Sequence, residues 1–325
     1  MKKITSLLLM LALLAASLFT PALAENKITV VAATFPLYDW TRQVLGEDSD
    51  VDLILLMDSG VDLHSFNPTA QDILRVASSD LFIYVGGESD EWVEDAQKHL
   101  INQKQIAISL METLGEAAKE EELVEGMQDD DDHDHDHDDD DEDETEYDEH
   151  VWLSLRNAEL FTQAIADALC QLNADRAEAY RANAAAYIAK LRELDARYAA
   201  MAAQASYDTL LFGDRFPFRY LADDYGLHYY EAFSGCSAET EASFQTIVFL
   251  AGKTDELGLP AVLTIEGANH RIAETIVQST AQKNQQVLTV DSMQGTTAKA
   301  IQEGVTYLGV MEKNLTVFAQ ALGAE

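Results

Sequence analysis

Residues 174–204 read ADRAEAYRANAAAYIAKLRELDARYAAMAAQ, a run of mostly helix-forming residues with no glycine and no proline. Because nothing in the run breaks a helix, we predict one continuous helix. At about 1.5 Å per residue, this helix would be about 46 Å long, the size of a whole small domain. A hairpin of two shorter helices is the alternative. We therefore expect a helix that runs the length of the molecule.

Short β-rich runs alternate with helical stretches on both sides of this segment. Before it, we predict strands over 28–33, 51–56 and 81–85 and helices over 37–45, 69–78 and 158–170. After it, we predict strands over 209–212, 227–233, 262–265 and 286–290 and helices over 217–225, 242–256, 272–282 and 306–322. Such alternation is typical of parallel sheets with crossover helices. The predicted fold is α/β, with two parallel-sheet lobes joined by one long rigid α-helix.

The chain has 325 residues, more than one hydrophobic core normally serves, so two lobes are favoured. We predict a signal peptide over 1–24, a first lobe over 25–157, connecting helices over 158–205 and a second lobe over 206–325. A disordered acidic loop is predicted within the first lobe, over 126–147. Parallel sheets bind ligands beyond the carboxyl ends of their strands, so we expect the functional site in the cleft between the lobes.

The first residues have the features of a targeting segment. Lys2 and Lys3 precede an apolar run over 7–19, and Ala-Leu-Ala over 22–24 is a small-residue cleavage motif. The apolar run is too short for a comfortable membrane span. We expect the mature protein to begin near Glu25 and to work in the periplasm or outside the cell. No cysteine follows the signal, so we expect no N-terminal lipid anchor.

The formal net charge is −37, and residues 129–149 alone contain 16 acidic side chains. The rest of the chain is acidic as well. Such a field repels nucleic acid and anionic membrane surfaces and raises the local concentration of cations. We therefore predict no nucleic-acid partner, and we expect a monomer.

Three histidines, His133, His135 and His137, alternate with aspartate inside the acidic run. The run has almost no apolar residues and is too charged to fold alone, so it is predicted to be disordered. A solvated loop without a ligand is one interpretation, and weak, rapid metal collection near the cleft is the other. Polyaspartate alone favours calcium or magnesium, whereas histidine shifts the preference toward zinc, copper or nickel.

Two further histidines are candidate metal ligands in the first lobe. His64 lies in the segment DLHSFNP over 62–68, a short loop after a predicted strand, and Asn67-Pro68 is predicted to start the next helix. His150 lies in YDEHVWL over 147–153, directly after the acidic run. A neutral imidazole suits zinc, manganese and other first-row metals, and the neighbouring carboxylates can orient the His150 ring. A lone loop histidine is more often solvated, so the case depends on partners.

Oxygen ligands are available in the second lobe, where Asp214, Glu266 and Asp291 each follow a predicted strand. Acidic residues at strand ends also serve as caps, so each has a structural alternative. His228 and His270 are weaker candidates. We predict a metal site made from His64 and His150 with these carboxylates.

The two cysteines are Cys170 and Cys236. Two cysteines form no disulfide framework, even in an oxidising compartment. They are interpreted as buried small hydrophobic residues or as one incidental disulfide.

Four features occur in a fixed order: TFPL over 34–37, DLHSFNP over 62–68, the acidic histidine-bearing loop, and DEHVWL over 148–153. This set resembles the zinc and manganese substrate-binding proteins of ABC transporters, over essentially the whole mature chain. The resemblance implies a cleft site with two first-lobe histidines, which map onto His64 and His150. It also implies binding without catalysis: a divalent metal, zinc first and manganese second, is delivered to a membrane permease.

The second lobe departs from the family pattern. In the segment FGDRFPF over 212–218, Gly213 occupies the usual position of the third ligand, and Asp214 is the natural substitute. The family's late carboxylate ligand most resembles Asp291, with Glu266 close behind. A site with two histidines and two carboxylates is harder than an all-histidine site, which widens the plausible ions to include manganese.

Two other functions remain open from the sequence. An acidic extracytoplasmic metal buffer or adhesin would use only the loop. A zinc-dependent hydrolase would also use histidines and carboxylates, but His-Glu-x-x-His and an obvious general base are absent from the sequence.

For the predicted receptor, a stiff helical connector would limit lobe motion to small tilts, so that release requires the transporter to disturb the site.

Overall fold

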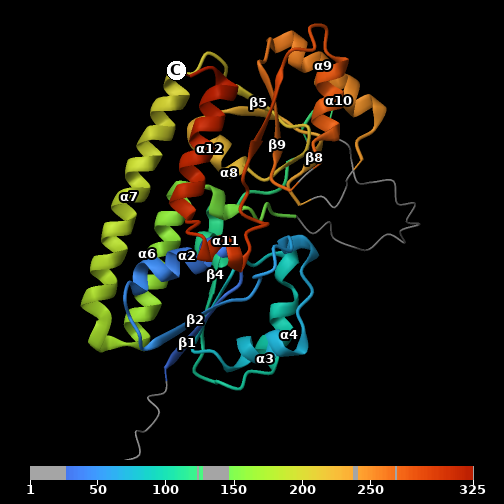
Figure 1. Cartoon of the computed structure of the whole chain (residues 1–325). Helices are drawn as coiled ribbons and strands as arrows, with labels where there is room; N and C mark the ends of the chain where they lie inside the picture. Colours follow the sequence, from blue (N-terminus) through green and yellow to red (C-terminus); the bar gives the residue numbers. More distant parts are fainter. Residues whose placement is uncertain (1–26, 123, 127–145, 237–240, 268, 325) are drawn as a thin grey trace, which may run out of the picture.

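The computed structural model describes residues 27–122, 124–126, 146–236, 241–267 and 269–324. The predicted signal peptide and most of the predicted acidic loop lie outside these residues. Within the described part of the chain, none of the helices is both long and apolar enough to cross a membrane. Two α/β lobes lie one above the other, and a long helix passes along both of them (Figure 1).

The first lobe is built on a four-stranded parallel sheet of order β2-β1-β3-β4. Its strands are β1 (Ile28–Ala32), β2 (Val51–Leu55), β3 (Leu81–Tyr84) and β4 (Ile106–Ser109). Its α-helices are α2 (Phe35–Leu45), α3 (Ala70–Ser78), α4 (Trp92–Lys98) and α5 (Leu110–Leu114). Short 3-10 turns cover η1 (Leu63–Ser65), η2 (Glu88–Asp90), η3 (Gly115–Ala117) and η4 (Val151–Leu153). Parallel pairing brings the carboxyl ends of all four strands to one edge, which faces the second lobe.

The second lobe also contains parallel strand pairs: β5 with β7, β6 with β8, and β9 with β10. The strands are β5 (Thr209–Leu211), β6 (Arg215–Phe216), β7 (His228–Tyr230), β8 (Phe233–Ser234), β9 (Ala261–Ile265) and β10 (Gln286–Val290). A parallel bridge between Phe212 and Leu263 joins the first and last pairs. The helices are α8 (Arg219–Tyr225), α9 (Phe244–Leu257), α10 (Arg271–Ser279), α11 (Ala298–Gln302) and α12 (Tyr307–Leu322). The predicted α/β fold with two parallel-sheet lobes is confirmed.

The connector is a helical hairpin of α6 (Leu155–Leu172) and α7 (Ala177–Gln204), with the 3-10 turn η5 (Ala174–Arg176) between them. The predicted long helix is present, but it begins three residues later because the first turn is 3-10. Its buried residues follow helical spacing and form one apolar stripe: Ala177, Tyr180, Ala184, Tyr187, Ile188, Leu191, Leu194, Tyr198 and Met201. This stripe is the surface that packs against the rest of the molecule.

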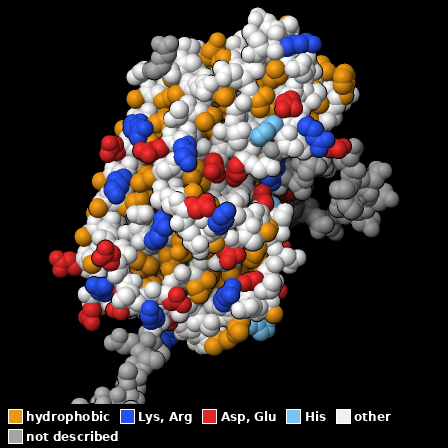
Figure 2. All heavy atoms as spheres, viewed as in Figure 1, with side chains coloured by type: hydrophobic (Ala, Val, Ile, Leu, Met, Phe, Trp, Pro, Cys, Tyr) orange, Lys and Arg blue, Asp and Glu red, His pale blue; other side chains and the backbone are white. Residues whose placement is uncertain are grey.

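Helix α7 is fixed to both lobes. The side-chain amide of Asn183 donates to the Val44 carbonyl in α2 at 3.0 Å, and the Tyr198 hydroxyl donates to the Met311 carbonyl in α12 at 2.7 Å. One continuous hydrophobic cluster includes Trp40 of the first lobe and residues of α6, α7 and α12. Figure 2 shows basic side chains interspersed with acidic ones over the outward face of these helices. The buried face therefore ties the lobes together, while the outward face is solvated.

Two local predictions are wrong. Helix α3 starts with a capping box, in which the Thr69 hydroxyl accepts from the Asp72 N–H and the Asp72 carboxylate accepts from the Thr69 N–H. Asn67-Pro68 therefore lies ahead of the helix and does not cap it. The single strand predicted over 227–233 is two short strands, β7 and β8, because each pairs with a different partner.

Candidate metal centre

His64 lies in η1, in the loop that follows β2. The Asp62 carboxylate caps this turn, with one oxygen accepting from the His64 N–H at 3.0 Å. The other oxygen accepts from the Arg215 guanidinium of the second lobe at 2.8 Å. Burial acts to raise the pKa of Asp62, but Arg215 and His64 outweigh it and hold that pKa below its usual value. The turn that presents His64 is therefore held from both lobes.

His150 is completely buried, immediately before η4. One oxygen of Asp148 accepts from the His150 backbone N–H at 2.8 Å and pairs with the ring Nδ1 at 2.9 Å. An ionised carboxylate can only accept, so it places the ring proton on Nδ1 and leaves a lone pair on Nε2. This is the arrangement in which a histidine binds a metal through Nε2.

The His64 ring is held by Ser89, whose hydroxyl lies 2.8 Å from Nδ1. A hydroxyl both donates and accepts, so this contact permits either tautomer of the ring. Burial, followed by the neighbouring His150, lowers the pKa of His64 to about 3. His64 is therefore neutral near pH 7, in the protonation state that metal binding requires.

Glu149 places a buried carboxyl group beside this pair. Its Oε2 lies 3.7 Å from Nδ1 of His64 and has no hydrogen-bond partner in the described part of the chain. The Glu149 side chain is buried, and burial raises its pKa. An unpartnered buried carboxylate oxygen is costly unless a positive charge lies nearby, so this position fits a site that holds a cation.

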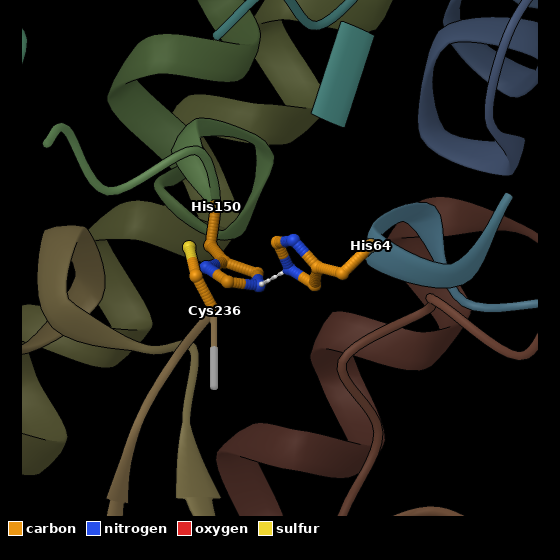
Figure 3. Close-up of side chains that lie close together, drawn as sticks. All are labelled: His64, His150 and Cys236. Carbon is orange, nitrogen blue, oxygen red and sulfur yellow. Dashed lines mark hydrogen bonds between the residues drawn. The ribbon is translucent and has the colours of Figure 1, made fainter. Parts of the chain in front are cut away.

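The two histidines are spaced like ligands of one ion. Their Nε2 atoms are 3.2 Å apart, and Figure 3 shows the rings facing each other through these nitrogens. Two nitrogens bound to one tetrahedral zinc at about 2.05 Å would be about 3.3 Å apart. The separation of the two nitrogens therefore matches that of two ligands of one metal ion.

A third donor, the sulfur of Cys236, lies near the pair (Figure 3). His64, His150 and Cys236 each offer one ligand atom, and these three atoms lie within 4.8 Å of one another. Among the described residues, this is the group of His, Cys, Asp or Glu side chains close enough together to hold a metal ion. Cys170 and Cys236 are both free, so the incidental disulfide is not present. Cys236 was not among the ligands predicted from the sequence, although an unpaired cysteine outside the cytoplasm is a signal of a partner or a ligand role.

Of the three predicted second-lobe carboxylates, Glu266 and Asp291 directly follow β9 and β10, and Asp214 lies in the short link between β5 and β6. They line a cleft with a volume of about 860 Å³ whose walls include Asp62 of the first lobe and Arg215 of the second. None of the three belongs to the group of donors around His64 and His150 within the described residues. Of the two weaker candidates, His270 lines this cleft, whereas His228 is exposed on β7.

Backbone N–H groups already donate hydrogen bonds to all three of these carboxylates. Asp214 accepts from the N–H groups of Arg215 and Ile265, at 2.9 and 3.2 Å. Glu266 accepts from the Ser292 N–H and hydroxyl, at 2.6 and 2.7 Å, and Asp291 accepts from the Met293 N–H at 2.8 Å. Burial and the adjacent Glu266 raise the pKa of Asp291 to about 6. These contacts match the capping role that was the alternative to ligation, and ligation by the three carboxylates stays a prediction.

Residues 30–321 match the model of the family described as "zinc-uptake complex component A periplasmic". This chain belongs to that family. It is 31% identical over 300 residues to the zinc-binding protein AdcA of Streptococcus pyogenes serotype M1, a match that covers 90% of this chain and 56% of AdcA. It is 30% identical over 297 residues to the high-affinity zinc uptake system protein ZnuA of Bacillus subtilis, which covers 91% of this chain and 88% of ZnuA. The chain thus spans about half the length of the AdcA relatives.

The structure is similar to the crystal structure of the Zn(II)-bound ZnuA-like domain of Streptococcus pneumoniae AdcA. The TM-score is 0.70 at 26% identity, over 91% of this chain and 99% of that one. The resemblance inferred from the motifs and the two-lobed fold are therefore confirmed. The family and these relatives are solute-binding proteins rather than enzymes, which removes the support for a zinc-dependent hydrolase.

Proposed function

We propose that this chain captures one zinc ion between its lobes through His64 and His150 and delivers it to the membrane permease of an ABC importer. The observation that supports this most directly is the pair of Nε2 atoms 3.2 Å apart, one from the fully buried His150 and one from the partly buried His64. Asp148 and Ser89 hold the far nitrogens of the two rings. The ion is bound and not chemically transformed. The site is largely formed before the ion arrives, which limits the cost of ordering it.

The acidic stretch is proposed to collect metal and not to hold the tightly bound ion. The segments on either side of it meet in an antiparallel bridge between Glu120 and Tyr147, and the Asp148 N–H donates to the Lys119 carbonyl. These contacts hold the chain two and three residues before His150. The charge of the acidic stretch would raise the local cation concentration at the entrance to the cleft.

Release is proposed to depend on the permease. Helix α7 is bonded to both lobes, and Arg215 of the second lobe pairs with Asp62 in the turn that carries His64. A wide hinge opening would have to break these contacts and divide a shared hydrophobic cluster. We infer that the permease loosens the contact at Asp62 and so displaces His64 by a small distance.

The relatives are extracytoplasmic, and one from Streptococcus pneumoniae is named a zinc-binding lipoprotein. We propose that this chain also works outside the cytoplasm, as a monomer. The proposed lobes are 25–157 and 206–325, joined by helices over 158–205.

The proposed function is tested by the zinc content and competitive zinc titration of the exported protein. The double variant His64→Ala plus His150→Ala should lose the tight ion. The matched control removes two exposed histidines elsewhere, His99→Ala plus His228→Ala, and should bind as wild type does. If the site variant keeps a tight zinc ion, the proposal is wrong.

Deleting residues 129–143 separates a receptor from a metal buffer. A cleft receptor should keep one tight ion and lose only weak, additional binding. A buffer or adhesin that uses the loop alone would lose nearly all of its metal.

A further inference from the structure

The cysteine beside the histidine pair differs from an ordinary buried cysteine. Cys170 belongs to the main hydrophobic cluster, and its thiol donates to the Ala177 carbonyl at 3.4 Å. Cys236 is part of none of the hydrophobic clusters formed by the described residues. Its surroundings are the imidazoles of His64 and His150 and the carboxylates of Glu121 and Asp148. Hydrophobic packing therefore accounts for the burial of Cys170 but not for the position of Cys236.

The backbone before Cys236 is pressed against the His150 ring. Cys236 follows strand β8 by one glycine, Gly235, and a Cβ atom at Gly235 would lie 3.0 Å from both Nδ1 and Cε1 of His150. A side chain at this position would push the segment away from the ring. The absence of a side chain thus lets this segment pack against the Nδ1–Cε1 edge of His150, which brings the Cys236 sulfur beside that ring (Figure 3).

The distances suit a tetrahedral ion. A sulfur at about 2.3 Å and a nitrogen at about 2.05 Å from one zinc would be about 3.6 Å apart. The three donor atoms already lie within 4.8 Å of one another. Ligation would therefore require the sulfur to move by up to about 1 Å toward the histidine nitrogens.

We propose that Cys236 binds the transported ion through its sulfur, so that His64, His150 and Cys236 form a His₂Cys site. The inference rests on the proposed function and specifies its ligand set. On coordination the sulfur–hydrogen bond breaks, the proton passes to the Glu121 carboxylate that faces the thiol or to solvent, and the sulfur lone pair binds the ion. No electron is transferred in this step.

A thiolate ligand determines which metals the site prefers. Sulfur is a soft donor that favours zinc and other thiophilic ions, whereas manganese, magnesium and calcium favour oxygen ligands. With Cys236 as a ligand, the site should reject manganese. With the predicted carboxylates in its place, the site would be harder and would accept manganese.

Cobalt(II) reports the ligand directly, because cobalt bound to thiolate gives an intense near-ultraviolet charge-transfer band that nitrogen and oxygen ligands do not give. Metal-free wild-type protein titrated with cobalt should develop this band, and so should the matched control Cys170→Ser. Cys236→Ser should bind cobalt without developing the band. Its zinc affinity should fall by about 100-fold, because loss of a group that only supports a ligand already costs about 10- to 100-fold. Its preference for zinc over manganese should fall as well.

A wild-type protein that binds zinc through its histidines but shows no thiolate band would overturn the Cys236 assignment and leave the proposed function intact. If zinc binding survives loss of both histidines, the proposed function itself fails. Should Cys236→Ser not fold, alkylation of the wild type decides the question. Bound zinc should slow labelling of Cys236 by iodoacetamide at least about tenfold and leave labelling of Cys170 unchanged. Equal labelling of Cys236 with and without zinc would contradict the proposal.

Discussion

Replacing Asp148 with asparagine tests how the protein prepares His150 for a metal. The asparagine would keep an oxygen that can accept from the His150 backbone and ring, but it would remove the negative charge. The wild-type contact at 2.9 Å joins a side chain that is 0% exposed to one that is 5% exposed. Water therefore screens this charge weakly, and a charge-assisted hydrogen bond is about twice as strong as a neutral one.

The expected effect of Asp148→Asn follows from these contacts. Loss of a group that bonds to the far nitrogen of a ligating histidine typically weakens metal binding by about 10- to 100-fold, or about 1.4 to 2.7 kcal/mol. We expect the upper half of this range, because one Asp148 oxygen accepts both hydrogen bonds from His150. The asparagine can also turn its amide toward the ring, which would favour the wrong tautomer.

The assay is zinc competition against a chromogenic chelator, with the thermal midpoint of the metal-free variant as a check on folding. Glu312→Gln is the matched control, because it also removes one negative charge but lies exposed on α12, paired with Arg197. The control should bind zinc as wild type does. A zinc Kd for Asp148→Asn within about threefold of wild type, alongside loss of binding in His150→Ala, would refute the reasoning about tautomer and charge.

Two further predictions concern stability. Tyr198→Phe should lower the free energy of unfolding by about 1 kcal/mol, since it removes the bond from α7 to the Met311 carbonyl. Tyr187→Phe should leave the free energy of unfolding unchanged or raise it, because the Tyr187 hydroxyl is buried with no partner among the described residues. Urea unfolding measures both variants, and an equal loss of stability in the two would contradict this account. Burial raises the pKa of Asp90 to about 6, above the roughly 3.9 of an unfolded chain, so the native state holds an extra proton between those values. The free energy of unfolding of the metal-free protein should therefore fall by up to about 3 kcal/mol as the pH rises from about 4 to 6. Asp90→Asn should remove that fall. If the variant shows the same pH dependence as wild type, Asp90 is not the cause of the fall.

Much of the architecture could be predicted because it depends on local patterns. The glycine-free run over 174–204 predicts its own helix, and the buried positions of α7 follow from helical spacing. The strand-to-helix alternation predicts parallel sheets, which bring loops such as that of His64 to one edge. The boundaries were less accurate where tertiary contacts decide them, as at β7 and β8, which pair with different strands.

The ligand set depends on contacts between residues far apart in the chain, and the sequence predicts these poorly. His64 and His150 could be found because each occurs in a characteristic motif. Cys236 lies 86 residues after His150 in an irregular segment, and its approach to the ring depends on packing of Gly235 against that histidine. Asp214 was predicted as a ligand that follows a strand, but the sequence does not show that backbone N–H groups donate to both its oxygens.

The most direct test of the central claim is a crystal structure of the zinc-loaded protein with anomalous diffraction measured on both sides of the zinc absorption edge. The account predicts one strong anomalous peak about 2.1 Å from Nε2 of both His64 and His150 and about 2.3 Å from the sulfur of Cys236. A peak held instead by Asp214, Glu266 and Asp291 in the wide cleft, with the two histidines unoccupied, would contradict it.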